Sequence, residues 1–260
     1  MAFRVATWNI LATAYIRREF YPKTPPQVLD PAWRLPEIVR HATALAVDIL
    51  CLQEVETPAF AALQEGLAEA GYIGRHALKS RNRPDGCATF FRGFSLVEER
   101  RIPYADGSGG RDSGHIGQLL ILNCDNKRLG ILNTHLKWDP PGTERDRQWG
   151  HRQILLAIET LRQTTPLDGQ IICGDFNVTG ESDVVHTLRA AGMDYAHRRC
   201  PGIATCNSNR EARLIDYLFH SASLHAKPAL PPPIDGRTVL PSPEQPSDHV
   251  PLMAEFDWVQ

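Results

Sequence analysis

The sequence lacks the features that mark membrane proteins, secreted disulfide scaffolds and zinc modules. No apolar run approaches the length needed to span a bilayer, and the N-terminus shows no leader with a small-residue cleavage site. The six cysteines stand singly, with no CxxC pair and no spacing typical of zinc ligands. We therefore expect a soluble, cytoplasmic protein with no membrane partner, whose cysteines are reduced and mostly buried.

The sequence also lacks an excess of charge of either sign. Its 28 lysine and arginine residues nearly balance 30 aspartate and glutamate residues, for a formal net charge of -2. Without a global basic field to attract a long nucleic acid, any anionic substrate must be held by a local site. The 260 residues are enough to bury a sizeable core, and we expect one domain spanning residues 1–260.

Short apolar and β-branched runs of strand length recur along the chain. They cover residues 3–10, 49–53, 88–98, 118–123, 129–135, 170–174, 214–219 and 252–258. Helices are expected over residues 35–46, 57–70, 149–161 and 182–191, with Thr57 as the cap of the second. A turn-like sequence between 118–123 and 129–135 predicts a hairpin and mixed sheets, which disfavours a purely parallel sheet. Residues 104–115 and 227–246 are expected to be surface loops.

Acidic and amide side chains stand at the ends of several expected strands. Asn9 closes the first strand and Glu54 follows the second. Asp175 and Asn177 follow the strand over 170–174, and Asp248 and His249 precede the last strand. Because sites are built at strand ends, we expect these side chains to converge at one edge, with His135 as a second imidazole.

This set of side chains is rich in hard oxygen ligands, which suit Mg²⁺ or Mn²⁺. No thiolate accompanies them and the histidines are single, so zinc is the weaker alternative. An isolated aspartate or asparagine after a strand commonly forms a turn, but the whole set in order favours chemistry. The reaction that fits such a site is hydrolysis of a phosphoester.

Six short motifs follow one another in a fixed order: TWNIL, LQEVE, NTHL, GDFN, IDYLF and SDH. This order resembles the endonuclease/exonuclease/phosphatase superfamily. The segments PDGCATFFR (84–92) and NTHLKWDP (133–140) are most similar to its branch of CCR4-type deadenylases, nocturnin, the 2′,5′-phosphodiesterase and the Angel proteins. The resemblance implies a four-layer α/β sandwich, in which two mixed β-sheets pack face to face with helices outside.

The resemblance also implies the metal ligands. Glu54 would be the principal Mg²⁺ ligand, with Asn9 nearby and Asp248 completing the metal region. A carboxylate suits that task, and Mn²⁺ would substitute for Mg²⁺.

The remaining motif residues take catalytic roles by the same resemblance. Asp175 would orient or deprotonate the attacking water, and Asn177 would donate a hydrogen bond to a non-bridging phosphate oxygen. His249 would contact the scissile phosphate or assist proton transfer, while Asp216 fixes its tautomer. His135 would donate to the phosphate. The other histidines match no motif and are expected to be structural or solvated: His41, His76, His115, His151, His186, His197, His220 and His225.

Three basic residues precede the PDGCATFFR segment. Lys79, Arg81 and Arg83 are expected to form an anion clamp beside the metal, with a solvated basic loop as the alternative.

Other substrate contacts are expected from Trp138, Pro140 and Asn207. In the deadenylase branch a proline and a downstream aromatic residue stack on the base of the leaving nucleotide. Pro140 matches that proline, but Glu211 lies near the position of the aromatic residue, which counts against adenine-specific deadenylation.

Two enzymatic functions fit the sequence. The first is a Mg²⁺-dependent 3′-exoribonuclease or phosphodiesterase acting on short or single-stranded RNA ends or on a 2′,5′ linkage. The second is a phosphatase that removes a terminal or 2′,3′-cyclic phosphate from RNA or from a nucleotide cofactor. A catalytically silent binding module ranks last because no core residue is missing, and a DNA-repair endonuclease would be expected to show a more basic groove. The expected partner is RNA or a nucleotide, bound by a monomer with no protein partner.

Overall fold

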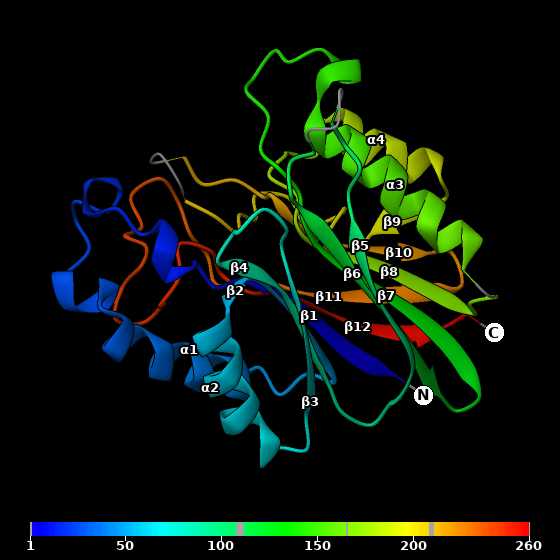
Figure 1. The fold of residues 1–260 in the computed structure, drawn as a ribbon, viewed down its shortest axis with the longest axis horizontal. Helices are drawn as coiled ribbons and strands as arrows, with labels where there is room; N and C mark the ends of the chain where they lie inside the picture. Colours follow the sequence, from blue (N-terminus) through cyan, green and yellow to red (C-terminus); the bar gives the residue numbers. More distant parts are fainter. Residues whose placement is uncertain (1, 108–111, 165, 208–210, 260) are drawn as a thin grey trace.

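The computed structural model describes residues 2–107, 112–164, 166–207 and 211–259. Within these ranges the strands form two six-stranded mixed sheets that pack face to face, with helices on the two outer faces (Figure 1). The prediction of a four-layer α/β sandwich is confirmed. No described helix is both long and apolar enough to cross a membrane.

The first sheet has the strand order β11-β12-β1-β2-β4-β3. β1 and β2 are parallel, and the other neighbours are antiparallel. Helices α1 (Pro31–Ala44) and α2 (Thr57–Ala68) cover its outer face, where Trp8, Leu52 and Phe90 pack against Ile38 and Leu63. The strands are β1 (Phe3–Asn9), β2 (Ile49–Glu56), β3 (Ile73–Leu78), β4 (Asp85–Phe91), β11 (Leu224–Ala229) and β12 (Leu252–Trp258).

The second sheet has the order β5-β6-β7-β8-β10-β9. β7 and β8 are parallel, and β6 and β7 form the predicted hairpin. Helices α3 (Trp149–Gln163) and α4 (Asp183–Ala190) cover this sheet from outside, with Ile154 and Leu188 packed on Phe176 and Phe219. The strands are β5 (Ser95–Pro103), β6 (Ile116–Cys124), β7 (Lys127–His135), β8 (Gly169–Asp175), β9 (Met193–Tyr195) and β10 (Asp216–Ser221).

Several predicted boundaries were wrong. The run over 88–98 is two strands, β4 and β5, because Gly93 adopts a left-handed φ of 76° and turns the chain between them. The predicted loop over 227–246 begins inside β11, an edge strand that tolerates Pro228 because edge positions have unpaired backbone groups. The predicted loop over 104–115 includes residues 108–111, which lie outside the described ranges.

The helix starts also differ from expectation in detail. α1 begins at Pro31 because Asp30 caps it, accepting a hydrogen bond from the Ala32 amide at 2.8 Å. Thr57 is the first residue of α2 and not its cap. The preceding Glu56 instead accepts hydrogen bonds from the backbone amides of residues 13 and 14, which fixes the segment after β1.

A polar network joins the two sheets inside an otherwise apolar interface. Asn133 on β7 accepts from the Gln53 side chain at 2.8 Å and donates to the carbonyls of Leu52 and Ala88, both at 3.1 Å. Thr89 on β4 donates to Gln118 on β6 at 2.8 Å. These buried amides specify how the sheets align, since any shift would leave buried polar groups unpaired.

Removing the Asn133 amide should therefore destabilise the fold strongly. Asn133→Ala leaves a cavity, removes one of the three hydrogen bonds of the Gln53 amide nitrogen and removes the Asn133 hydrogen bonds to two carbonyls. We therefore expect the free energy of unfolding to fall by about 3 kcal/mol. Urea denaturation measures this change. Gln163→Ala, on the exposed face of α3, is the matched control and should change stability by less than about 0.5 kcal/mol. Equal stability of the two variants would show that the network adds nothing.

Candidate active site

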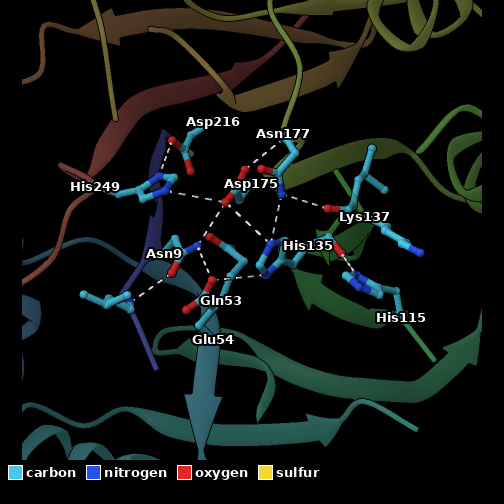
Figure 2. A network of polar contacts seen from close by, with 12 residues as sticks. Asn9, Gln53, Glu54, His115, His135, Lys137, Asp175, Asn177, Asp216 and His249 are labelled. Carbon is cyan, nitrogen blue, oxygen red and sulfur yellow. Dashed lines mark hydrogen bonds and ion pairs between the residues drawn. The ribbon is translucent and has the colours of Figure 1, made fainter. Parts of the chain in front are cut away.

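Seven of the predicted site residues converge at one end of the two sheets (Figure 2): Asn9, Glu54, His135, Asp175, Asn177, Asp216 and His249. Register brings them together: Asp175 is paired with His135 on one side and with Asp216 on the other. Asn9 and Glu54 lie at the ends of the parallel strands β1 and β2 of the facing sheet. Both sheets thus contribute acidic side chains to the same place.

Glu54 reaches the site through an irregular backbone. The register of β2 against β4 shifts between Gln53 and Val55, and Glu54 has a left-handed φ of 57°. Such a conformation costs a non-glycine residue about 1–3 kcal/mol and is concentrated at functional sites. The carboxylate then accepts from the Ala12 amide at 2.8 Å and from the Asn9 side chain at 3.1 Å.

Asp175 is at the centre of the cluster. Its Oδ2 accepts from the Asn9 amide at 2.9 Å and lies 3.6 Å from His249 Nε2 and 3.7 Å from His135 Nε2. Its Oδ1 accepts from the Asn177 backbone amide at 2.9 Å. Burial raises the pKa of Asp175, and the positive charge of His249 opposes that rise.

The backbone before Asp175 needs a glycine. Gly174 has a φ of 141°, and a Cβ atom there would lie only 1.7 Å from the carbonyl oxygen of Thr134 on β7. The first residue of the GDFN motif must therefore be glycine, because β7 and β8 lie too close together there for a side chain.

His249 and Asp216 form a buried pair. His249 Nδ1 lies 2.9 Å from Asp216 Oδ2, so the ring donates this proton to the carboxylate. Burial alone would lower the pKa of His249, but the charges of Asp216 and Asp175 raise it well above its ordinary value. Potential ligand atoms of Asp175, Asp216 and His249 lie within 4.8 Å of one another. The hydrogen bond occupies His249 Nδ1, so this trio is better suited to holding a proton than to holding a metal.

His135 is held neutral. Lys79 Nζ lies 3.3 Å from its Nδ1 and the Asn177 amide nitrogen lies 3.1 Å from its Nε2. Burial lowers the pKa of His135 well below its ordinary value, and the charge of Lys79 lowers it further. The Asn177 amide also donates to the Leu136 carbonyl at 2.9 Å, which fixes its orientation beside the ring.

The predicted anion clamp is only partly assembled. Lys79 is buried and paired with Asp85 at 2.6 Å, and the charges of Lys79 and Arg83 both act on His135. Arg81 instead donates to the backbone carbonyl of Asp112 at 2.9 Å, which turns its guanidinium toward that exposed loop.

Of the other predicted substrate residues, Trp138 and Pro140 are exposed and Asn207 contacts Asp248. Trp138 is 54% exposed and Pro140 is also exposed, so both have accessible faces. Asn207 lies beside Asp248, donating its backbone amide to the Asp248 carbonyl at 3.5 Å and its side chain to the Thr238 carbonyl at 2.6 Å. Asp248 accepts from the Tyr21 hydroxyl at 3.0 Å.

Sequence reasoning missed four residues that support the site. Tyr15 donates to Asp85 at 2.5 Å, and Asp85 is the buried ion-pair partner of Lys79. Arg34 is buried and donates to the Ile10 carbonyl at 2.7 Å, holding the segment after β1. The His115 ring contacts the His135 ring edge-on, with centroids 5.7 Å apart, although no motif had placed it near the site. Only Asp85, inside the PDGCATFFR segment, had a sequence signal.

Similarity to known proteins agrees with this architecture. The CCR4-Not complex 3′-5′-exoribonuclease subunit Ccr4 of Candida albicans is 28% identical over 239 residues, covering 77% of this chain and 30% of that protein. The 2′,5′-phosphodiesterase 12 of Homo sapiens is 25% identical over 324 residues, covering 98% of this chain and 51% of that protein. The chain thus spans about half or less of the length of these curated relatives.

A solved structure shows the same fold. ANGEL2, described as a 2′,3′-cyclic phosphatase, superposes with a TM-score of 0.84 at 20% identity, covering 98% of this chain and 95% of that chain. The curated matches confirm the resemblance to CCR4-type proteins and to the 2′,5′-phosphodiesterase, and ANGEL2 shares the fold. The model of the Endonuclease/Exonuclease/phosphatase family matches residues 6–249, nearly the whole chain, and the chain therefore belongs to that family.

Proposed function

We propose that this phosphoester hydrolase uses Mg²⁺ to cleave phosphodiester bonds in short or single-stranded RNA, acting as a 3′-exoribonuclease or phosphodiesterase through one catalytic domain spanning residues 1–260. The observation that supports it most is the convergence of Glu54, Asp175 and His249, each buried or nearly so and each held by its own hydrogen bonds. The relative named as a 3′-5′-exoribonuclease subunit supports RNA as the substrate.

The residues present fit a divalent cation. Burial raises the pKa of Glu54, and the nearby negative charge of Asp248 raises it further, while Lys79 opposes the rise. Buried carboxylates that lie close to one another are stabilised by a cation that prefers oxygen ligands. Glu54 and Asp248 would hold Mg²⁺ or Mn²⁺, which when bound neutralises phosphate charge and stabilises the leaving oxygen.

Asn9 would complete the metal region through its side-chain oxygen. In the structure the Asn9 amide nitrogen bridges Glu54 and Asp175, and its oxygen accepts from the Leu11 amide at 2.9 Å. Asn9 thus has a second task that the sequence did not suggest, because it separates two carboxylates that would otherwise repel each other.

Asp175 would orient and deprotonate the attacking water. A raised pKa makes this carboxylate a stronger base than an exposed aspartate, and its backbone and side-chain hydrogen bonds fix its direction. One water molecule then attacks phosphorus in line with the leaving oxygen, with no covalent enzyme intermediate.

Three side chains beside Asp175 would contact the phosphate. His249 stays protonated because Asp216 holds its Nδ1 proton, which leaves Nε2 as a charged donor. His135 and the Asn177 amide would add donors once the phosphate replaces their mutual contact, in which the Asn177 amide nitrogen lies 3.1 Å from His135 Nε2. Neither group adds negative charge. Donors fixed before the reaction stabilise the charge that develops on the phosphate oxygens.

A second candidate is a phosphatase that removes a terminal or 2′,3′-cyclic phosphate. The exposed Glu211, near the position where the deadenylase branch has a stacking aromatic residue, favours it. A phosphatase of this kind does not need to bind the nucleotide base next to the scissile phosphate tightly.

Turnover on a small panel distinguishes the two functions. The panel contains 3′-hydroxyl oligo(A), a mixed-sequence RNA, a 2′,5′-linked oligomer, an RNA with a 2′,3′-cyclic phosphate and NADP, each with Mg²⁺ and with EDTA. Stepwise release of mononucleotides supports the exonuclease. Phosphate release or cyclic-end opening without chain shortening supports the phosphatase, and no turnover on any substrate contradicts both.

Glu54→Gln should abolish Mg²⁺-dependent turnover without unfolding the protein. The amide keeps the shape of the side chain at a strained backbone position and can keep one of its two accepted hydrogen bonds, but it removes the charge that attracts the cation. In the absence of metal we expect an equal or higher Tm, because one buried negative charge is gone. Glu65→Gln, exposed on α2, is the matched control. Retained turnover in Glu54→Gln would refute the ligand role.

Asp175→Asn should lower kcat by about 10²–10⁴ and change KM much less, because it removes the base and leaves the donors in place. Steady-state kinetics on the best substrate of the panel measures both constants. If KM rose while kcat stayed unchanged, Asp175 would contribute to binding and not to the chemical step.

A further inference from the structure

A cavity of about 690 Å³ opens next to the predicted metal region. One wall is the segment over residues 19–24, after β1, and the other is the loop over 236–240 before β12. In Figure 1 these are the blue segment and the orange-red segment at the left of the view, above helix α1. The volume falls within the range of small-molecule and cofactor sites.

The walls of the cavity are fixed to each other by hydrogen bonds. The Thr24 hydroxyl donates to the Pro241 carbonyl at 2.8 Å, which joins the two segments. Arg18 donates to the Tyr21 carbonyl at 3.3 Å and to the Thr24 carbonyl. The cavity is therefore largely pre-formed, and a ligand would pay little to order it.

Asp248 connects the cavity to the active site. It lines the cavity and accepts from the Tyr21 hydroxyl at 3.0 Å, while its neighbour His249 is 3.6 Å from Asp175. Burial and the charge of Asp248 raise the pKa of Tyr21, so the hydroxyl stays protonated and donates to Asp248. A substrate at the scissile position would thus extend into this cavity on the side of Asp248.

The lining of the cavity combines one accessible aromatic ring with two cations. Phe20 is 69% exposed, which is unusual for a large apolar side chain. Lys23 and Arg237 are exposed, and within the described part of the chain neither side chain has a hydrogen bond or an ion pair. Apart from Asp248, the acidic side chain on the lining is Glu19.

We propose that this cavity binds the nucleotide adjacent to the scissile phosphate, with its base stacked on Phe20 and its own phosphate held by Lys23 and Arg237. The proposal rests on the proposed function and names its substrate class: a chain with at least one phosphate besides the one that is cleaved. An aromatic face beside basic side chains is the common arrangement for single-stranded nucleic acid, because every base has a π-face and every phosphate a charge. A cavity open to the metal region favours a substrate over a protein partner.

Equilibrium binding in EDTA tests the cavity without hydrolysis. The probe is a fluorescein-labelled single-stranded oligoribonucleotide, and fluorescence anisotropy gives its Kd. Phe20→Ala and the double variant Lys23→Ala/Arg237→Ala should each raise Kd about tenfold. The slope of log Kd against log salt should fall by about 0.7 for each cation removed. Arg128→Ala, at the opposite end of β7 from His135, is the matched control. It should change Kd and the salt slope only by the small amount that follows from the loss of one positive charge anywhere on the surface.

Wild-type protein without measurable binding, or variants that bind like the Arg128→Ala control, would overturn the proposal. Because Phe20, Lys23 and Arg237 are exposed, circular dichroism of each variant should match the wild type.

A kinetic comparison separates this proposal from the proposed function. The ratio of kcat/KM for a trinucleotide to kcat/KM for bis(p-nitrophenyl) phosphate should fall about tenfold in the double variant. An unchanged ratio in an active enzyme would contradict nucleotide binding in the cavity and leave the proposed function intact. If the wild type hydrolyses no RNA but the variants still lose binding in EDTA, the proposed function fails and the cavity stands.

Discussion

The arrangement of the site depends on two carboxylates, Glu54 and Asp175, that are brought from different sheets into a buried space. Burial raises the pKa of each, so the structure must supply compensating donors. The Asn9 amide donates to both, and backbone amides of Ala12 and Asn177 supply one donor to each carboxylate. The remaining need for positive charge is what makes this place suited to a divalent cation and a phosphate.

The alignment of the two sheets is what sets the distance between these carboxylates. Gln53, next to Glu54 in β2, donates to Asn133 on β7, two residues before His135. The network behind the site therefore fixes the relation of β2 to β7, and β7 fixes Asp175 through the register of β7 with β8. A shift of the sheets would separate the predicted metal region from the predicted base. Fold and chemistry thus share one set of buried amides.

The positions of most site residues could be predicted from the sequence because each follows or precedes a recognisable strand. Asn9, Asp175 and His249 are examples, and the structure places Asn9 within hydrogen-bond distance and His249 within ion-pair distance of Asp175. The way in which the Glu54 carboxylate enters the site could not be predicted from the sequence. It depends on a register shift and a left-handed backbone conformation that β-strand patterns do not encode.

Contacts between distant segments were also invisible to sequence patterns. The contact of His115 with His135 joins two residues that match no common motif spacing. The cavity between residues 19–24 and 236–240 forms from two loops that are far apart in the chain and lack regular structure beyond short turns. The division of 88–98 into two strands depended on one glycine, which periodicity of apolar residues alone did not reveal.

We propose that Glu54 binds the cation and that Asp175 acts as the base, and calorimetric titration with Mn²⁺ and Mg²⁺ distinguishes these two roles. The wild type, Glu54→Gln and Asp175→Asn proteins would be titrated under the same conditions. We expect the Asp175→Asn protein to retain cation binding and the Glu54→Gln protein to lose it. Binding retained by Glu54→Gln and lost by Asp175→Asn would contradict the assignment of the ligand and the base.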